Sequence, residues 1–263
     1  MNTAAILVIG NEILDGVTLD TNSHWLTQQL KPLNFTVQTT IAIRDKISEI
    51  TKTIHRLEKD QIHLIITTGG LGPTYDDMTL QGVATALNRP LQLNKKAYKI
   101  VERQYKDYYE KGVVDTPEIT DARRKMAILP QGARPLDNKA GGAPGVLLTY
   151  ENNTIISLPG VPSELKWIFN HQVKPILKEK TKGHYHEKII HLNLRDESTL
   201  APIIDKVKKT DQKVYIKSMV KPYGEPGIRL WISAHGDNKE EIIQRVEKII
   251  TLLIELTRDQ VQE

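Results

Sequence analysis

Residues 62–79, IHLIITTGGLGPTYDDMT, hold the strongest structural signal in the chain. Residues 62–67 form an apolar run, which is typical of a central strand that is buried on both faces of a parallel sheet. A glycine-rich turn follows at residues 69–74, and a helix is expected after it. The segment therefore predicts a strand–loop–helix unit of an α/β protein.

The segments before this unit alternate between the apolar periods of strands and helices. Strand patterns occupy residues 5–9 and 35–43, and apolar residues recur at helical spacing in residues 22–33 and 48–57. The resulting order, β-α-β-α-β-loop-α, predicts a mostly parallel sheet with helices on both faces.

The segments after this unit are more mixed. Residues 94–126 are rich in Lys, Tyr, Glu and Arg, and predict helices that face solvent. Strand signals return in three short segments, at residues 127–129, 145–150 and 154–158. Asn152-Asn153 is predicted as a hairpin turn, and a helix is expected from about Pro162 to His171. We expect these elements to complete a first domain over residues 1–180.

A domain boundary is predicted at Thr181-Lys182-Gly183. The pattern beyond it is strand, helix, strand, strand and helix, at residues 187–195, 197–209, 213–219, 228–234 and 239–257. Glycine and proline at residues 222–227 predict the turn between the last two strands. Residues 185–263 are therefore expected to form a small α+β domain of βαββα order.

The composition excludes several classes of protein. Of the 263 residues, 39 % are hydrophobic and 26 % are charged, which favours a folded chain over a disordered one. The absence of cysteine excludes disulfide frameworks and thiolate chemistry. A net charge of +4 is too mild to predict nucleic-acid binding. No apolar run approaches the roughly 20 residues that span a bilayer, and the N-terminus does not resemble a signal peptide, so we expect a cytoplasmic protein with no membrane partner.

The glycine-rich loop carries the strongest chemical signal. Its backbone N–H groups and the following helix are suited to holding a phosphate, and ligands of parallel sheets bind beyond the carboxyl ends of the strands. The candidate binding residues of the loop are Thr68, Gly69, Gly70, Gly72 and Thr74. Asp76 and Asp77 add carboxylates that could hold a cation or a hydroxyl. The alternative is a tight turn in which an Asp caps the helix.

A second segment, residues 10–22, also follows a strand and should open on the same edge of the sheet. Its candidates for metal, ribose or base contacts are Gly10, Asn11, Glu12, Asp20 and Asn22. The alternative for Asp20 or Thr21 is an ordinary helix N-cap. Asp45 follows another strand and could face the same crevice, with a capping role as its alternative.

Two further turns complete the candidate site. Residues 157–164 end a strand and begin a helix, where freed N–H groups could hold a phosphate; the candidates are Pro159, Gly160, Pro162, Ser163 and Glu164. Residues 140–145 could bring backbone close to a ligand through Gly142, Ala143 and Pro144. The alternatives are a rigid turn for the first and a flexible connector for the second.

Four ordered motifs together resemble a known family. GNEILDGVTLDTNSHWLTQQL, TTGGLGPTYDDMT, GGAPG and LPGVPSELKWIF are similar to the N-terminal domain of the CinA family, over about residues 4–171. That domain is similar to the molybdopterin-binding fold of MoaB, MogA and MoeA. The resemblance implies a three-layer α/β/α domain, followed by a small KH-like domain.

The resemblance also implies an activity, namely divalent-metal-dependent hydrolysis of ADP-ribose to AMP and ribose 5-phosphate. Gly69, Gly70 and Gly72 would line the ligand site, and Asp77 and Asp45 match the two acidic residues of the molybdopterin-binding proteins. We expect Asp76, Asp77 and Asp45 as catalytic carboxylates, and Asp20 and Asp77 as ligands of Mg²⁺, Mn²⁺ or Co²⁺.

The resemblance leaves other readings open. The same pocket could serve a molybdopterin-binding or adenylyl-transfer protein, or a nucleotide-binding protein without catalysis. A homo-oligomer, most simply a dimer, is expected from the family. The chain ends at Glu263 without the nicotinamide mononucleotide deamidase domain of full CinA proteins, so deamidase activity is not expected.

Overall fold

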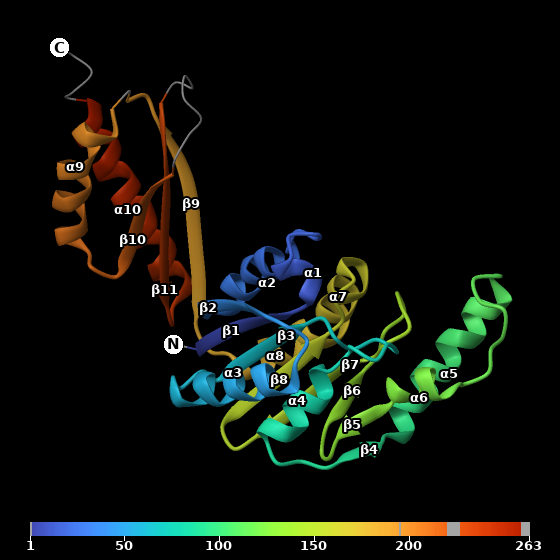
Figure 1. Cartoon of the computed structure of the whole chain (residues 1–263). Coiled ribbons are helices and arrows are strands. Elements are labelled where there is room, and N and C mark those ends of the chain that lie inside the picture. Colours follow the sequence, from blue (N-terminus) through green and yellow to red (C-terminus); the bar gives the residue numbers. More distant parts are fainter. Residues whose placement is uncertain (1, 195, 220–226, 259–263) are drawn as a thin grey trace. The chain divides into compact units, whose positions relative to one another are not determined.

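The structure is a computed structural model that describes residues 2–194, 196–219 and 227–258 (Figure 1). The chain divides into two compact units. Unit 1 comprises Met1–Lys31 and Phe35–Lys180, and unit 2 comprises Pro32–Asn34 and Thr181–Glu263. The division in the chain falls at the Thr181-Lys182-Gly183 segment, where the sequence predicts a boundary. In the described part of the chain, no helix combines the length and the apolar composition needed to cross a membrane.

Unit 1 is built on a six-stranded sheet with the order β2-β1-β3-β8-β7-β6. The strands are β1 (Asn2–Ile9), β2 (Phe35–Ile43), β3 (Leu64–Thr68), β6 (Arg134–Leu136), β7 (Gly145–Tyr150) and β8 (Asn153–Leu158). The first four in the sheet order pair in parallel, β7 pairs antiparallel with β8, and β6 pairs antiparallel with β7. The sheet is therefore mostly parallel, as the sequence predicts.

Helices cover both faces of this sheet, which gives the three-layer α/β/α architecture. Alternate strand residues such as Leu7 and Ile65 pack in one core with Ile50, Ile54 and Val83 of α3 and α4. The helices α2 and α7 lie on the other side (Figure 1). The bounds of these helices are α2 (Asn22–Leu30), α3 (Ile47–Lys59), α4 (Thr79–Ala86) and α7 (Pro162–Ile168). The apolar stripe of each helix thus faces the buried strands.

The remaining elements of unit 1 flank this framework. They are α1 (Asn11–Leu14), β4 (Leu91–Leu93), α5 (Lys95–Glu110), α6 (Asp121–Lys125), β5 (Ile128–Pro130), the π-helical η2 (Phe169–Val173) and α8 (Lys174–Lys180). The 3₁₀ turn η1 (Lys31–Leu33) follows α2 and leads into the Pro32–Asn34 segment of unit 2. β4 and β5 form a separate antiparallel pair. The side chain of Asn94 accepts hydrogen bonds from the N–H groups of Lys96 and Ala97, and so caps α5.

Three predicted boundaries of unit 1 are corrected by the structure. The hairpin turn is Glu151-Asn152 and not Asn152-Asn153, because Tyr150 pairs with Asn153 and Glu151 adopts a φ of 46°. The α-helix predicted for residues 22–33 ends at Leu30 and tightens to a 3₁₀ turn, which contains Pro32. The helix predicted to end near His171 continues through η2 and α8 to Lys180.

Unit 2 has the predicted order of strand, helix, strand, strand and helix. Its elements are β9 (His184–Leu192), α9 (Glu197–Thr210), β10 (Val214–Met219), β11 (Ile228–Gly236) and α10 (Lys239–Arg258). The sheet is antiparallel with the order β10-β11-β9, and residues of α9 and α10 share its apolar core. β9 lies three residues earlier than the predicted 187–195. The turn predicted at 222–227 lies, except for Gly227, outside the described residues.

Candidate active site

A cavity of about 460 Å³ opens beyond the carboxyl ends of the parallel strands of unit 1. Gly10 follows β1, Asp45 follows β2, Gly69 follows β3 and Pro159 follows β8, and all four residues line the cavity. Parallel strands end on the same edge of a sheet, so these loops converge although they are far apart in sequence. Of the residues predicted for the site, those that line the cavity are Gly10, Glu12, Asp45, Gly69, Gly70, Gly72, Thr74, Asp76, Asp77, Gly142, Ala143, Pro159, Gly160 and Glu164.

The glycine loop is fixed in place by backbone contacts. Gly69 and Gly70 have φ values of +96° and +65°, a conformation that L side chains rarely adopt. A Cβ atom added at Gly69 would lie 2.1 Å from the carbonyl oxygen of Ile9, so no side chain fits there. The N–H of Gly69 donates to the Leu158 carbonyl, and the Thr79 hydroxyl donates to the Gly69 carbonyl. The loop is thereby tied to β1, β8 and α4.

The next three N–H groups of the loop have no protein partner within the described ranges. Among the residues that the structure describes, the N–H groups of Gly70, Leu71 and Gly72 donate to no protein acceptor. All three residues line the cavity. Successive unpaired N–H groups in a glycine turn form a concave site that favours an anion such as phosphate.

Asp76 and Asp77 fold back onto the same loop. Asp77 Oδ2 accepts the Thr74 N–H at 2.8 Å and lies 2.7 Å from Thr74 Oγ1, and Asp76 Oδ1 lies 2.5 Å from the same hydroxyl. The Thr74 hydroxyl lowers the pKa of Asp76, so this carboxylate is charged at neutral pH. Neither Asp caps α4, whose N-cap is Met78 without a side-chain hydrogen bond. The helix-capping alternative is therefore wrong.

Asp45 brings a further carboxylate to the cavity. Its Oδ2 accepts the backbone N–H of Asn11 at 2.7 Å. Burial raises the pKa of Asp45, and the negative charges of Glu12 and Asp76 raise it further. Asp45 does not cap α3, which begins after Lys46 with no side-chain cap, but it accepts the first N–H of the short helix α1. Three loops therefore concentrate negative charge on one side of the cavity.

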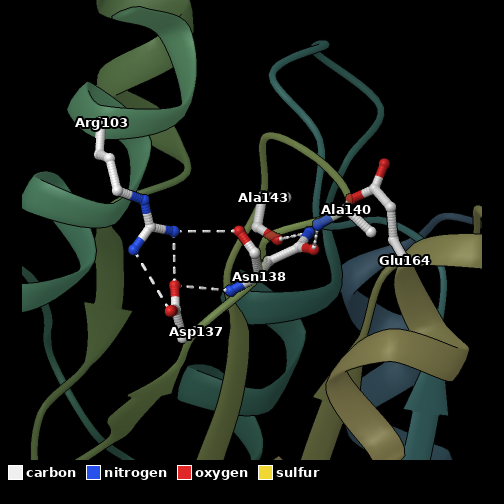
Figure 2. A network of polar contacts seen from close by, with 6 residues as sticks. All are labelled: Arg103, Asp137, Asn138, Ala140, Ala143 and Glu164. Carbon is white, nitrogen blue, oxygen red and sulfur yellow. Dashed lines mark hydrogen bonds and ion pairs between the residues drawn. The ribbon is translucent and has the colours of Figure 1, made fainter. Parts of the chain in front are cut away.

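Glu164 lies on α7 and is held by a polar network centred on the buried Asn138 (Figure 2). Asn138, which is fully buried, donates from Nδ2 to Glu164 Oε2 at 2.7 Å and to the Ala143 carbonyl at 2.8 Å. Its Oδ1 accepts the Ala140 N–H. Arg103 of α5 pairs with Asp137 at 2.6 Å and also donates to the Asn138 carbonyl. Burial raises the pKa of Glu164, and the Asn138 hydrogen bond opposes that shift.

Some cavity residues were not predicted from the sequence. Tyr105 and Tyr108 of α5 line the cavity together with Met126, and Asn138 supports it from behind. These residues belong to a segment whose composition indicates only solvent-facing helices, or to a connector without a motif. The helical spacing of the two tyrosines, three residues apart, is a weak signal that they share one face of α5.

Other predicted residues do not line the cavity. Asp20 Oδ1 accepts the Ser23 N–H at the start of α2, and Oδ2 contacts the Ser23 hydroxyl. The Asp20 carboxylate thus satisfies the start of the helix, although Thr21 is the N-cap residue. Asn22 donates from Nδ2 to the Gly160 carbonyl at 2.8 Å, so it supports a cavity loop. The other predicted site residues that do not line the cavity are Asn11, Thr68, Pro144, Pro162 and Ser163. Within the described ranges, no group of three or more His, Cys, Asp or Glu side chains is arranged to hold a metal ion.

This fold and cavity define an α/β ligand-binding domain with a glycine loop at the carboxyl edge of its sheet. Residues 5–179 match the family described as "Probable molybdopterin binding domain", and the chain belongs to this family. A protein of Sulfurisphaera tokodaii is 39 % identical over 256 residues, which cover 96 % of this chain and 94 % of the relative. A protein of Pyrococcus horikoshii is 36 % identical over 248 residues, 94 % of each chain.

A solved structure confirms the resemblance to CinA. The crystal structure of the protein CinA with unknown function from Thermoplasma acidophilum is 31 % identical, with a TM-score of 0.59. The match covers 66 % of this chain and 99 % of that chain. The CinA-type, molybdopterin-binding-like fold predicted from the four motifs is thus the fold of unit 1.

Proposed function

We propose that unit 1 binds a phosphorylated pterin, or a nucleotide of similar size, in the cavity at the carboxyl edge of its sheet. The observation that carries this proposal is that Gly70, Leu71 and Gly72, three successive residues that line the cavity, have N–H groups without a protein acceptor in the described part of the chain. Backbone N–H groups of this kind can bind a phosphate without the help of side chains. The family to which the chain belongs supports a pterin as the rest of the ligand.

The remainder of the cavity suits a flat polar ring. Its volume of about 460 Å³ is in the range of small-molecule sites. Tyr105, Tyr108 and Met126 supply apolar surface, and Glu164 supplies a hydrogen-bond acceptor. A ligand with a phosphate at one end and a ring at the other would use both parts of the lining.

The test is a titration of the full chain with neopterin phosphate and with neopterin, followed by the fluorescence of the pterin ring. We expect the phosphorylated compound to bind at least tenfold more tightly. Gly70→Ala should abolish this difference, because a Cβ atom at Gly70 would lie 2.3 Å from Thr79 Oγ1 and displace the loop.

Gly112→Ala is the matched control for this experiment. Gly112 has a φ of +67°, almost equal to that of Gly70, but an added Cβ atom would meet nothing within 4 Å. The control variant should bind like the wild-type protein. Equal affinity for neopterin and its phosphate in the wild-type protein would refute phosphate binding at the glycine loop.

A second candidate function, hydrolysis of ADP-ribose to AMP and ribose 5-phosphate, is favoured by the carboxylates beside the loop. Asp76, Asp77 and Asp45 all line the cavity. They do not form a complete metal cage, but Mg²⁺ often uses one or two carboxylates together with phosphate oxygens of the ligand. Asp76 and Asp77 would hold such an ion, which when bound would neutralise phosphate charge. Asp45, with its raised pKa, would accept a proton from the attacking water.

Purified protein incubated with ADP-ribose and Mg²⁺, Mn²⁺ or Co²⁺ tests this second candidate, with AMP followed by chromatography. Asp77→Asn keeps an oxygen for the Thr74 N–H but removes the charge, and should lower turnover at least a hundredfold. AMP release that Asp77→Asn leaves unchanged would point to a contaminating enzyme and count against this candidate.

A further inference from the structure

We propose that Glu164 is the ring-recognition residue of the cavity and selects ligands whose ring edge presents two adjacent N–H donors. This edge is the 2-amino-4-oxopyrimidine edge that pterins and guanine share. The inference rests on the proposed function, since it names the part of the ligand that lies away from the phosphate.

The position of Glu164 supports this role. Its side chain is partly buried on the cavity wall, and one carboxylate oxygen, Oε2, accepts a hydrogen bond from Asn138. Figure 2 shows that the other oxygen points away from Asn138. In the described part of the chain, Oε1 has no protein donor within hydrogen-bond distance. An ionised carboxylate only accepts hydrogen bonds, so a ligand group that meets it must donate.

Asn138 holds the carboxylate and has all of its own polar groups paired. Both its amide and its backbone groups are used, by Glu164, Ala143, Ala140, Asp137 and Arg103. A fully satisfied buried network holds one geometry, because any other arrangement would leave a buried polar group unpaired. Glu164 is therefore preorganised, which lowers the entropic cost of ligand binding.

The loop that contains Gly141 also restricts the Glu164 side chain. A Cβ atom added at Gly141 would lie 1.8 Å from the carboxyl carbon of Glu164. The backbone of this loop thus packs directly on the carboxylate, and it limits the rotamers that the side chain can adopt. Gly142 and Ala143 from the same loop line the cavity.

This arrangement discriminates between ring edges. A guanine-type edge offers N1–H and the 2-amino group. The carboxylate can accept both hydrogen bonds, one at the free Oε1 and one at Oε2, which keeps a second lone pair beside the Asn138 hydrogen bond. An adenine edge presents an unprotonated N1, whose lone pair would face the negative carboxylate. A site built to receive donors rejects a ring that lacks them, because its acceptor is left unpaired.

Binding of GMP, IMP and AMP to the full chain, measured by calorimetry, tests the inference. The three nucleotides share the ribose 5′-phosphate and differ in their rings: IMP lacks the 2-amino group, and AMP also lacks N1–H. We expect affinity to fall in the order GMP, IMP, AMP, with at least a tenfold difference between the first and the last. This series needs no variant and does not depend on the folding of one.

The variant Glu164→Gln then tests whether the preference for GMP over AMP depends on this residue. The variant keeps an oxygen for Asn138 but places an amide donor toward the ligand, so GMP affinity should fall at least tenfold. AMP affinity should rise, because the amide N–H can donate to N1 of adenine. Glu110→Gln, an exposed residue of α5 outside the cavity lining, is the control and should keep the wild-type order.

The outcomes separate the two proposals. If none of the three nucleotides and no pterin phosphate binds, the proposed function itself is wrong. If all three nucleotides bind equally, or AMP binds best, the phosphate site stands and the role of Glu164 is refuted. A preference for GMP that survives in Glu164→Gln would also refute it.

Discussion

At the scale of single residues, the glycine loop is the part of the site that tolerates least change. Gly69 has a φ of +96°, and a Cβ atom there would lie 2.1 Å from a backbone oxygen, which cannot rotate away. Gly132 also has a positive φ, +85°, but nothing lies within 4 Å of an added Cβ atom. A comparison of the two positions therefore distinguishes the cost of backbone strain, present at both, from the cost of a steric clash, present only at Gly69.

We expect Gly69→Ala to lower the free energy of unfolding by about 3 kcal/mol or more, because both strain and displacement of β1 contribute. Gly132→Ala should cost about 1 kcal/mol, from strain alone. Urea unfolding of the full chain measures both variants. Equal losses at the two positions would show that the contact with Ile9 does not restrict the loop.

Asp45 and Asp15 carry charges with opposite consequences for stability. Burial raises the pKa of Asp45, so this group stabilises the fold below its unfolded-state pKa and loses that contribution as pH rises through the folded-state value. Arg44 lies 2.6 Å from Asp15 and lowers its pKa, so Asp15 contributes above its unfolded-state pKa and loses that contribution as pH falls through the lowered value.

Asp45→Asn is therefore expected to raise Tm at pH 7 and to change it little at pH 3, where the wild-type carboxyl is already protonated. The amide oxygen can still accept the Asn11 N–H. Asp15→Asn should have the opposite sign at pH 7. Circular dichroism melts from pH 3 to pH 8 follow both variants, and a Tm gain for Asp45→Asn that does not depend on pH would contradict this explanation.

At the scale of elements, α3 and α4 pack unusually closely at Gly82. A Cβ atom added to Gly82 would lie 2.5 Å from both Cβ and Cγ2 of Ile50, and the Thr51 hydroxyl donates to the Gly82 carbonyl. The absence of a side chain lets the two helices approach over the same face of the sheet. α4 follows the glycine loop directly, so this contact also supports the candidate site.

Gly82→Ala should destabilise the protein by about 1–3 kcal/mol through overpacking, although alanine favours helix by about 1 kcal/mol over glycine. Thr85→Ala, at an exposed position of the same helix, is the control and should be neutral or slightly stabilising. Thermal unfolding measures both variants. A stabilised Gly82→Ala protein would mean that α4 can shift away from Ile50 at little cost.

At the scale of the whole molecule, the candidate cavity belongs to one of the two units. Every residue that lines the candidate cavity belongs to unit 1. Unit 2 has its own apolar core, formed by β9, β10, β11, α9 and α10. A ligand of this cavity should therefore stabilise the two units unequally.

Hydrogen exchange of the full chain with and without neopterin phosphate checks this expectation. At a concentration of about 100 times Kd, binding should add about 2.7 kcal/mol to the stability of unit 1. Protection should rise in residues 69–77 and 159–164 and stay unchanged in β9 and β11. Equal protection of both units would show that unit 2 takes part in binding.

The sequence by itself predicts the framework of unit 1 well. The strand at residues 64–68, its glycine loop and the helix after it follow from local periodicity and from the backbone freedom of glycine. Parallel strands end on one edge of the sheet, so the meeting of Glu12, Asp45, Asp77 and Glu164 could also be expected before the structure. These properties depend on short segments and on a general rule of topology.

Tertiary structure decides the parts that depend on distant packing. Asp20 satisfies the start of α2 and does not line the cavity, a choice that the local pattern leaves open. Tyr105 of α5 lines the cavity and Asn138 hydrogen-bonds Glu164, and no sequence motif marks either contact. Contacts between side chains that are far apart in sequence depend on tertiary packing, and a short stretch of sequence does not predict them.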